Sequence, residues 1–509
     1  MSPAPRGEAA GSDAAARGEA AGGDRAAPAE AAGGDRAARG EAAGGDAAAP
    51  GGAVSPPPGY LGAEGRVRSG PAPELVAAGY ELELADADLL HGGLTLADLA
   101  HVIAHPAIPD GDRRTLLRAL LELDAGGPAI EDPRYGDLVN VRERELEQRI
   151  GTAAGWLNAG RPRREAGRIA FRVALRTRVL DLEQAALRLA TALTDQATRE
   201  RDTPMPDFTY LQAAQPTTAG HWLLSHAAPA LRDAERTARD FAAINQSPAG
   251  AGGVNGSRYP LDRERLAALL GFDAPITHTR DAMWRTDDIT ETTHHAATVA
   301  TTASRFAEDV ELYSSDEFGL IRIGDAFCRA SALMPQKRNP YALVVIRGAA
   351  GTLLGRATGV LATQRTPSGR TDNLLYAYGE VTGAVELATR TVDLAAAVTE
   401  SLDFNAAELP EATFAADVAE ALTRHRGIDY RTAYKIVAAG GELGFDPAPY
   451  MRFDAAMATR TVTGGAAPGP MDAMLADTRE TIAAATTRLK RRREALRTAE
   501  AALRQLAVC

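Results

Sequence analysis

The sequence predicts an all-α protein built around a long helical bundle, and three observations carry this prediction. The first is an apolar stripe whose members are three and four residues apart, the spacing of one face of a long helix. The second is a set of further long segments with the same periodicity. The third is the near absence of the strict alternation that marks half-buried strands, so the pattern indicates a bundle. The main stripe comprises Val381, Val385, Ala388, Val392, Ala395, Val398 and Leu402.

Two other segments repeat this helical pattern. Residues 474–506 form one of them, and they include a basic patch at residues 490–493. Long helices of this kind often bury their remaining apolar faces in an oligomer. The other segment carries Ile169, Val173, Leu180, Leu187 and Ala190.

The composition excludes several classes of protein. The chain has 509 residues, 45% hydrophobic and 24% charged, which is enough for roughly two or three domains with a large core. A net charge of −11 argues against a general nucleic-acid surface. Cys328 and Cys509 are too few for a disulfide framework or a cysteine-rich metal site. No uninterrupted apolar run reaches the roughly 20 residues that span a bilayer, and the amino terminus lacks the apolar core of a secretory signal. We expect a cytoplasmic protein with no metal, cofactor, nucleic-acid or membrane partner.

Residues 1–58 have a composition of their own, dominated by Ala, Gly, Glu, Asp, Arg and Pro. A short unit, GEAAGGD, recurs imperfectly around Glu8, Glu19, Glu30 and Glu41, at intervals of 11 residues. An 11-residue period can support a helical supercoil, but the recurring glycine pairs and the missing apolar seam favour disorder. We expect residues 1–58 to be a disordered repeat tail without chemistry.

The most unusual segment is residues 330–340, which read ASALMPQKRNP. It combines small residues with the hydroxyl of Ser331, the cation of Lys337 and the amide of Asn339. Asn followed by Pro suits an N-cap and a first helical position. Composition alone therefore favours a loop that leads into a helix, with Asn339 as the cap.

Similarity to known sequences adds a functional interpretation. Residues 330–340 resemble the mobile-loop motif GSSxMPxKxNP of the fumarase/aspartase superfamily, in the LMPQK-x-NP form that is typical of argininosuccinate lyases. Other segments resemble the same family in the same order, over roughly residues 80–505. Residues 160–163 resemble its TGRSRND segment, 208–216 its THLQxAQP segment, 250–264 its GAGALAGxxYPxDRE segment, and 416–434 its carboxy-terminal helical domain. On these motifs the chain is identified as a divergent member of the superfamily.

The resemblance implies a fumarase/aspartase-like fold of three helical domains with a long central bundle. We expect an N-terminal helical domain at residues 59–160, a central bundle domain with the catalytic loop at 161–405, and a C-terminal helical domain at 406–509. It also implies a homotetramer whose active sites each draw the segments of Thr209, Arg163 and Ser331 from different subunits. Activity would then depend on assembly.

The resemblance further implies an elimination in which Ser331 is the base. Family members cleave a C–N or C–O bond beta to a carboxylate and usually release fumarate. A serine hydroxyl is normally too weak a base for this step, but in the family a closing loop surrounds it with backbone N–H groups and a lysine. The family serine lies six residues before that lysine, which is Ser331 here. Ala332 and Ala330 replace the second serine and the leading glycine.

The carboxylate-binding half of the family site is retained. Lys337 and Asn339 occupy positions that hold a substrate carboxylate, and Thr209 matches a carboxylate-binding threonine. Arg163 matches the family arginine and Gln212 a glutamine near the site. Each residue alone is more often structural than catalytic, but as an ordered set around Ser331 they predict a dicarboxylate site.

The leaving-group half departs from the family. Tyr210 replaces the family histidine, and Val344 replaces the glutamate that pairs with it. We keep Tyr210 as the candidate acid, although a phenol, with a reference pKa of about 10, is poorly matched to this task at neutral pH. Arg164, a candidate substrate-binding residue, replaces an asparagine, and Val139 replaces a histidine. Downstream of Pro367 and Ser368 the family has a tyrosine, a glutamine and a lysine near the arginine moiety, where this sequence instead reads GRTDNLLYAYG over residues 369–379.

These patterns favour a specialised lyase acting on a small dicarboxylate. We predict β-elimination from a substituted succinate, either an N-substituted aspartate or a nitrosuccinate-like compound, with release of fumarate in secondary metabolism. A stabilised anion such as nitrite leaves without a proton, whereas an amine leaves badly without one. Two alternatives stay open: a true argininosuccinate lyase with Tyr210 as its acid, and a catalytically silent homologue with a structural or binding role.

Overall fold

The computed structural model describes residues 69–127, 132–365, 369 and 374–508. The chain divides into two units, Met1–Gly52 and Ala53–Cys509, and every element given below belongs to the second unit. The repeat tail predicted for residues 1–58 lies outside the described residues. The described part is mainly helical with a few short strands, which confirms the all-α prediction.

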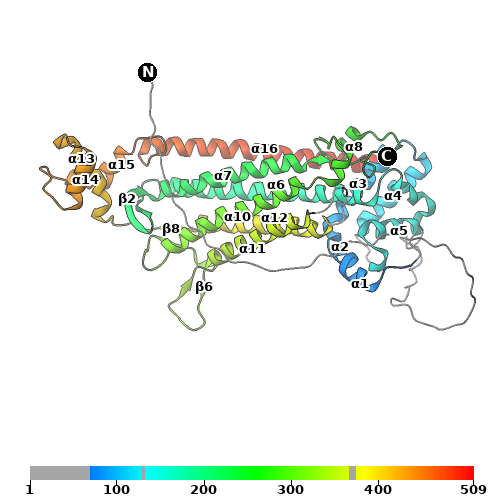
Figure 1. The fold of residues 1–509 in the computed structure, drawn as a ribbon, viewed down its shortest axis with the longest axis horizontal. Helices are drawn as coiled ribbons and strands as arrows, with labels where there is room; N and C mark the ends of the chain where they lie inside the picture. The colour runs from blue at the N-terminus through cyan, green and yellow to red at the C-terminus, as the bar shows by residue number, and fades with distance from the viewer. Residues whose placement is uncertain (1–68, 128–131, 366–368, 370–373, 509) are drawn as a thin grey trace, which may run out of the picture. The chain divides into compact units, whose positions relative to one another are not determined.

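A central bundle of long helices runs side by side (Figure 1). In it α6 packs against α7 and α12, while α10 packs against α7, α11 and α12. Many of the interior side chains are alanines, which let the helix backbones approach closely. The helices are α6 (Arg163–Arg199), α7 (Ala219–Ile244), α10 (Asp287–Tyr313), α11 (Tyr341–Thr363) and α12 (Leu375–Glu400).

The predicted apolar stripes line the interior of this bundle. On α12 every member of the stripe from Val381 to Val398 is fully buried, and Leu402 is buried just beyond the end of the helix. On α6, Leu180 and Leu187 are buried as well. Complete burial of a Val or Leu side chain stabilises the fold by about 1.5–3 kcal/mol. The stripes therefore stabilise the packing of these two helices within the bundle.

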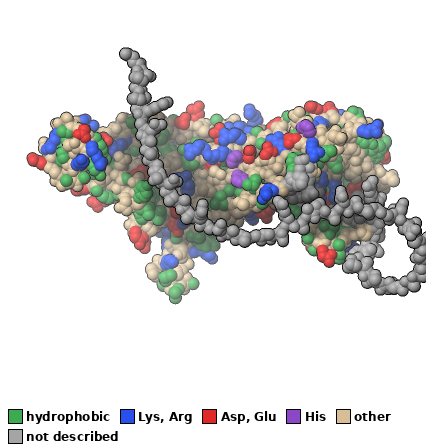
Figure 2. Space-filling model, viewed as in Figure 1, with side chains coloured by type: hydrophobic (Ala, Val, Ile, Leu, Met, Phe, Trp, Pro, Cys, Tyr) green, Lys and Arg blue, Asp and Glu red, His purple; other side chains and the backbone are tan. Residues whose placement is uncertain are grey.

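The last helix, α16 (Pro468–Val508), runs along α6 and α7 and also contacts the N-terminal helices. Lys and Arg side chains gather along it (Figure 2), where the sequence predicts a basic patch. Arg488 and Arg492 each lie 3.3 Å from the fully buried Glu183 of α6, and Arg493 lies 2.7 Å from Asp181. These three arginines therefore fasten α16 to α6.

Shorter helices form the remaining parts of the second unit. The N-terminal helices share a core with the end of α16 through Leu99, Leu116, Leu120 and Leu503. The predicted domain limits near residues 160 and 405 stay predictions. These shorter helices are α1 (Pro73–Leu75), α2 (Glu81–Ala85), α3 (Ala87–Ala104), α4 (Asp110–Gly126), α5 (Leu138–Ile150), α8 (Arg263–Leu269), α9 (Thr279–Trp284), α13 (Ala415–Arg426), α14 (Tyr430–Ala438) and α15 (Phe453–Thr459).

Within the described ranges, the strands form only two-stranded sheets, and two of these carry candidate site residues. β1 (Pro204–Thr209) pairs antiparallel with β2 (Gln212–Thr218), and β6 (Arg329–Ala330) pairs antiparallel with β7 (Arg338–Asn339). The other pairs are β3 (Gln246–Ser247) with β4 (Ala274–Pro275), and β5 (Ile321–Arg322) with β8 (Asp403–Phe404).

Among the helices that the structure describes, α11 alone has the length and apolar composition of a membrane span. Its Arg347 lies 3.2 Å from Glu308 of α10, and its Arg356 lies 3.7 Å from Glu380 of α12. These ion pairs, together with its packing against both neighbours, identify α11 as a helix of the bundle. Its outward face nevertheless exposes apolar side chains, namely those of Val344, Val345, Leu354 and Leu361.

Candidate active site

Ser331 begins the loop between β6 and β7, which projects from the bundle (Figure 1). The Ser331 Oγ accepts hydrogen bonds from the backbone N–H groups of Leu333, at 3.2 Å, and Met334, at 3.0 Å. Two N–H donors directed at one hydroxyl oxygen favour negative charge on that oxygen. This local geometry suits a hydroxyl that acts as a base once its proton has been removed.

Lys337 and Asn339 lie on the same hairpin. Lys337 is exposed, and its backbone N–H closes a turn onto the carbonyl of Met334 at 3.1 Å. The Asn339 amide donates across the hairpin to the Arg329 carbonyl at 3.1 Å. The prediction of Asn339 as the helix cap is therefore wrong. Asn339 belongs to β7, its amide is engaged across the strands, and α11 begins at Tyr341.

Tyr210 lies at the tip of the β1–β2 hairpin, in a strained turn. Thr209 and Gln212 form the last strand pair and are both exposed, with Tyr210 and Leu211 between them. Their φ angles of 54° and 58° belong to a left-handed turn that normally takes Asn and Gly. For residues with a Cβ this costs roughly 1–2 kcal/mol each. Tyr210 is 98% exposed, and such strain is typical of functional positions.

Arg163 and Arg164 are the first residues of α6, where they meet buried acids. Arg163 lies 3.4 Å from Asp137, the residue that caps α5. Arg164 lies 3.4 Å from Asp137 and 3.2 Å from Glu83 of α2. Burial raises the pKa of Glu83, and the nearby Arg164 opposes that rise. The helix start is therefore a cluster of two cations and two acids.

Val139 and Arg164, which stand where the family has a histidine and an asparagine, line one cavity of about 40 Å³. Tyr378 of α12 lines it too, and its ring stacks on that of Phe171 at 4.1 Å. Burial raises the pKa of the Tyr378 phenol. Two of the departures from the family pattern thus lie at one place in the fold. Sequence reasoning missed Glu83 here, because an acid on a short amphipathic helix gives no separate signal.

Glu165 anchors the start of α6 to the glycine-rich segment at residues 250–264. Its carboxylate accepts the N–H groups of Gly250, at 2.7 Å, and Gly252, at 2.8 Å, and the side chain is buried. Burial raises its pKa to about 7, while the two glycine N–H groups and Arg161 act in the opposite direction. The sequence offered one signal for this contact, the glycine-rich segment at residues 250–264.

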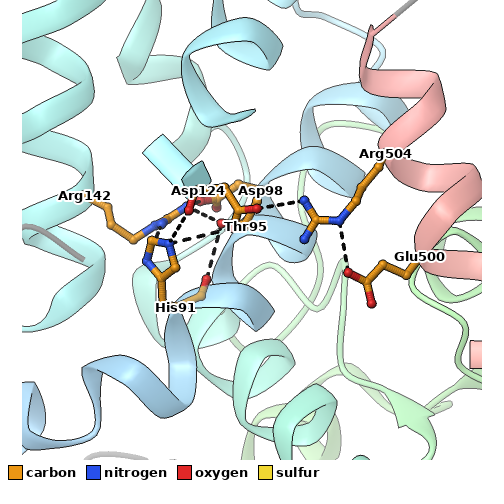
Figure 3. Close-up of polar contacts among 7 residues, drawn as sticks. All are labelled: His91, Thr95, Asp98, Asp124, Arg142, Glu500 and Arg504. Carbon is orange, nitrogen blue, oxygen red and sulfur yellow. Dashed lines mark hydrogen bonds and ion pairs between the residues drawn. The ribbon is translucent and has the colours of Figure 1, made fainter. Parts of the chain in front are cut away.

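A buried polar network supports the same region (Figure 3). Arg142 of α5 donates to the His91 ring, to Thr95 and to Asp98, each at 3.2 Å. His91 in turn lies 3.7 Å from Asp124 of α4. The network ends on α16, where Arg504 donates to Asp124 at 2.8 Å and to Glu500 at 3.0 Å.

Asp98 connects this network to the α6 start. Its second oxygen accepts a hydrogen bond from Arg161 at 2.6 Å, and Arg161 lies two residues before Arg163. Arg161 also donates to the carbonyl of Ala97 at 3.1 Å. A chain of polar contacts therefore runs from the last helix to Arg161, two residues before the pair of arginines.

The candidate site residues fall into groups that one chain cannot bring together. Arg163 and Arg164 begin α6, whereas Thr209, Tyr210 and Gln212 follow its end at Arg199. A helix of 37 residues is about 55 Å long, so these groups lie at opposite ends of α6. Ser331 belongs to a third group, on the β6–β7 hairpin. Within one chain, Arg163 and Arg164 therefore do not meet the residues of the hairpin tip.

The comparisons with known proteins agree with this fold. Residues 132–355 match the sequence profile of the lyase family. The argininosuccinate lyase of Halobacterium salinarum is 34% identical over 377 residues, which cover 72% of this chain and 76% of that protein. The argininosuccinate lyase of Nocardia farcinica is 36% identical over 395 residues, covering 74% and 81%.

Solved structures share the architecture at lower identity. An EDDS lyase in complex with formate matches with a TM-score of 0.76 at 24% identity, over 86% of this chain and 96% of that chain. A class II fumarase from Schistosoma mansoni matches with a TM-score of 0.61 at 16% identity, over 72% and 89%. The chain therefore belongs to the fumarase/aspartase superfamily of lyases, as a divergent relative of the argininosuccinate lyases.

Proposed function

We propose that this protein is a carbon–nitrogen lyase that removes the nitrogen substituent from a substituted succinate and releases fumarate. The observation that carries the proposal is the Ser331 hydroxyl, which accepts two backbone N–H groups on a loop that also holds Lys337 and Asn339. Relatives with about a third of their residues identical are named argininosuccinate lyases. We assign the activity to the cytoplasm and to specialised metabolism.

In the proposed reaction, Ser331 as its alkoxide takes the proton from the carbon next to one carboxylate and becomes the neutral hydroxyl. The electron pair moves into that carboxylate as an aci-carboxylate, for which Lys337 supplies positive charge and Asn339 a hydrogen bond. The pair then returns to form the double bond of fumarate, and the C–N bond breaks with its electrons on nitrogen. A nitrite anion leaves in this way without a proton, whereas an amine takes one, for which Tyr210 is the candidate donor.

We further propose that each site is completed by other copies of the chain in a homotetramer. The length of α6 separates Arg163 from the tip that carries Thr209, Tyr210 and Gln212, so one site containing both needs two copies. Two surface features support this assembly. One is the exposed, strained hairpin tip, and the other is the exposed apolar face of α11.

The test is a panel of N-substituted aspartates, nitrosuccinate and argininosuccinate, with fumarate followed by its ultraviolet absorbance. We expect turnover of at least one compound by the wild-type protein and a loss of about 10²–10⁴-fold in Ser331→Ala. Absence of turnover across the panel contradicts the proposal and leaves the silent homologue as the better description.

Argininosuccinate itself is the second candidate substrate, because the relatives carry that name. Complementation of a strain that requires arginine separates the two candidates. Growth identifies an argininosuccinate lyase, and its absence in a protein that releases fumarate from another compound identifies the specialised enzyme.

A further inference from the structure

The cavity beside Arg163 has walls from five helices, with Arg163 itself at its edge. A succinate whose carboxylate is bound by Arg163 therefore lies beside this cavity. The remaining walls that matter here are Glu83 of α2, Leu90 and Leu94 of α3, Val139 of α5, Arg164 of α6 and Tyr378 of α12.

An ion pair between two distant segments closes part of this space. The Arg164 guanidinium makes two hydrogen bonds to the Glu83 carboxylate, at 3.2 and 3.4 Å. The two side chains are only 20% and 8% exposed, and Asp137 lies 3.4 Å from the same guanidinium. Arg164 is therefore held in the wall of the cavity by two acids and is not an isolated surface cation.

The other charged side chains that line the cavity also have partners in the described structure. Asp86 accepts the backbone N–H of Gly379, and Arg168 donates to the carbonyl of Met283 at 2.6 Å. Arg163 lies 3.4 Å from Asp137. The surface left to a ligand is mainly apolar, and it comes from Leu90, Leu94, Leu138 and Val139.

The space that remains is small. Its volume is about 40 Å³. A nitro group or a methylamino group is much smaller than a whole arginine. The family residue at position 164 is an asparagine, which is shorter than arginine and carries no charge.

We propose that the Arg164–Glu83 ion pair is a plug that restricts the substrate to a succinate with a compact substituent, such as a nitro or a methylamino group. This inference rests on the proposed elimination. It assigns to Arg164 and Glu83 the selection of the departing group by size, with Val139 as a further wall of the same cavity.

The experiment compares substrates of increasing substituent size. The full-length protein is mixed with nitrosuccinate, N-methylaspartate, N-propylaspartate, N-benzylaspartate and argininosuccinate, and kcat/KM is obtained from fumarate release. The test variant is Arg164→Asn/Glu83→Gln, which removes both charges together and leaves neither one buried alone. Its matched control is Arg178→Asn/Glu386→Gln, the same change in an ion pair of 2.6 Å between α6 and α12.

For the wild-type protein we expect kcat/KM to fall at least about tenfold between the compact and the bulky compounds. The double variant at the plug raises kcat/KM for bulky compounds by about tenfold, and the control pair leaves the size preference unchanged. Val139→Ala enlarges the same cavity without changing a charge, and it shifts the preference in the same direction by a smaller factor.

The outcomes separate the plug from the reaction itself. Wild-type protein that processes bulky and compact compounds equally well overturns the plug, as does a size preference that survives both the double variant and Val139→Ala. Absence of fumarate from every compound with every protein overturns the proposed function, and the inference falls with it.

Discussion

Asp98 is the common partner of two buried arginines, and its removal tests whether this network holds the α6 start in place. Its oxygens lie 3.2 Å from Arg142 and 2.6 Å from Arg161, and all three side chains are at most 7% exposed. Asp98→Asn keeps the shape but removes the charge and turns an NH₂ group toward one guanidinium. Because a buried charge then loses its counter-charge, we expect the free energy of unfolding to fall by about 3–5 kcal/mol.

The measurement is urea unfolding followed by circular dichroism, at one fixed protein concentration because assembly contributes to stability. The control is Glu494→Gln, which breaks an ion pair of 2.7 Å to Arg497 whose side chains are 66% and 71% exposed. That control loses less than about 1 kcal/mol. An Asp98→Asn protein as stable as the control refutes the reasoning. We also expect slower fumarate release from Asp98→Asn without urea, because Arg161 lies two residues before Arg163.

Three further predictions concern the loop, a buried acid and the hairpin tip. Ser331→Ala lowers kcat by about 10²–10⁴-fold and leaves the circular dichroism spectrum unchanged, and equal rates in both proteins exclude Ser331 as the base. Glu165 has a pKa of about 7 when folded and 4.5 as its ordinary value, so unfolding releases a proton between these pH values. Stability therefore falls as pH rises through this window, by about 3 kcal/mol, and thermal unfolding across pH 4.5–7 shows a flatter profile for Glu165→Gln. Leu211→Gly relieves a positive φ and raises the free energy of unfolding by about 1 kcal/mol in urea titrations, whereas a decrease shows that the tip is not strained.

The helices and their buried faces could be predicted because periodicity is a local property of the sequence. The stripe of α12 is buried as expected, and so is that of α6 from Leu180 onward. The cap at Asn339 could not be predicted, since its amide is used by a partner strand at Arg329 that the local pattern does not reveal. A local sequence pattern gives a wrong prediction of a helix cap where a tertiary contact uses the side chain that would have formed the cap.

The candidate site was predictable in part. The position of Ser331 in a turn with backbone donors follows from the loop motif. The ion pair of Arg164 with Glu83 joins residues that are 81 positions apart, and the contacts of Glu165 with Gly250 and Gly252 join residues even slightly farther apart. No spacing rule relates such residues, so their pairing becomes visible only when the helices are packed together.

The most direct test of the account is a mixed oligomer of two inactive variants, Ser331→Ala and Arg163→Ala, co-expressed with different tags. If the two residues of each site come from different copies, random assembly supplies an intact Ser331 to half of the sites and an intact Arg163 to half of them. About a quarter of the sites then have both residues, and about a quarter of wild-type fumarate release returns. Mixed oligomers that contain both variants in equal amounts and remain inactive contradict the shared site.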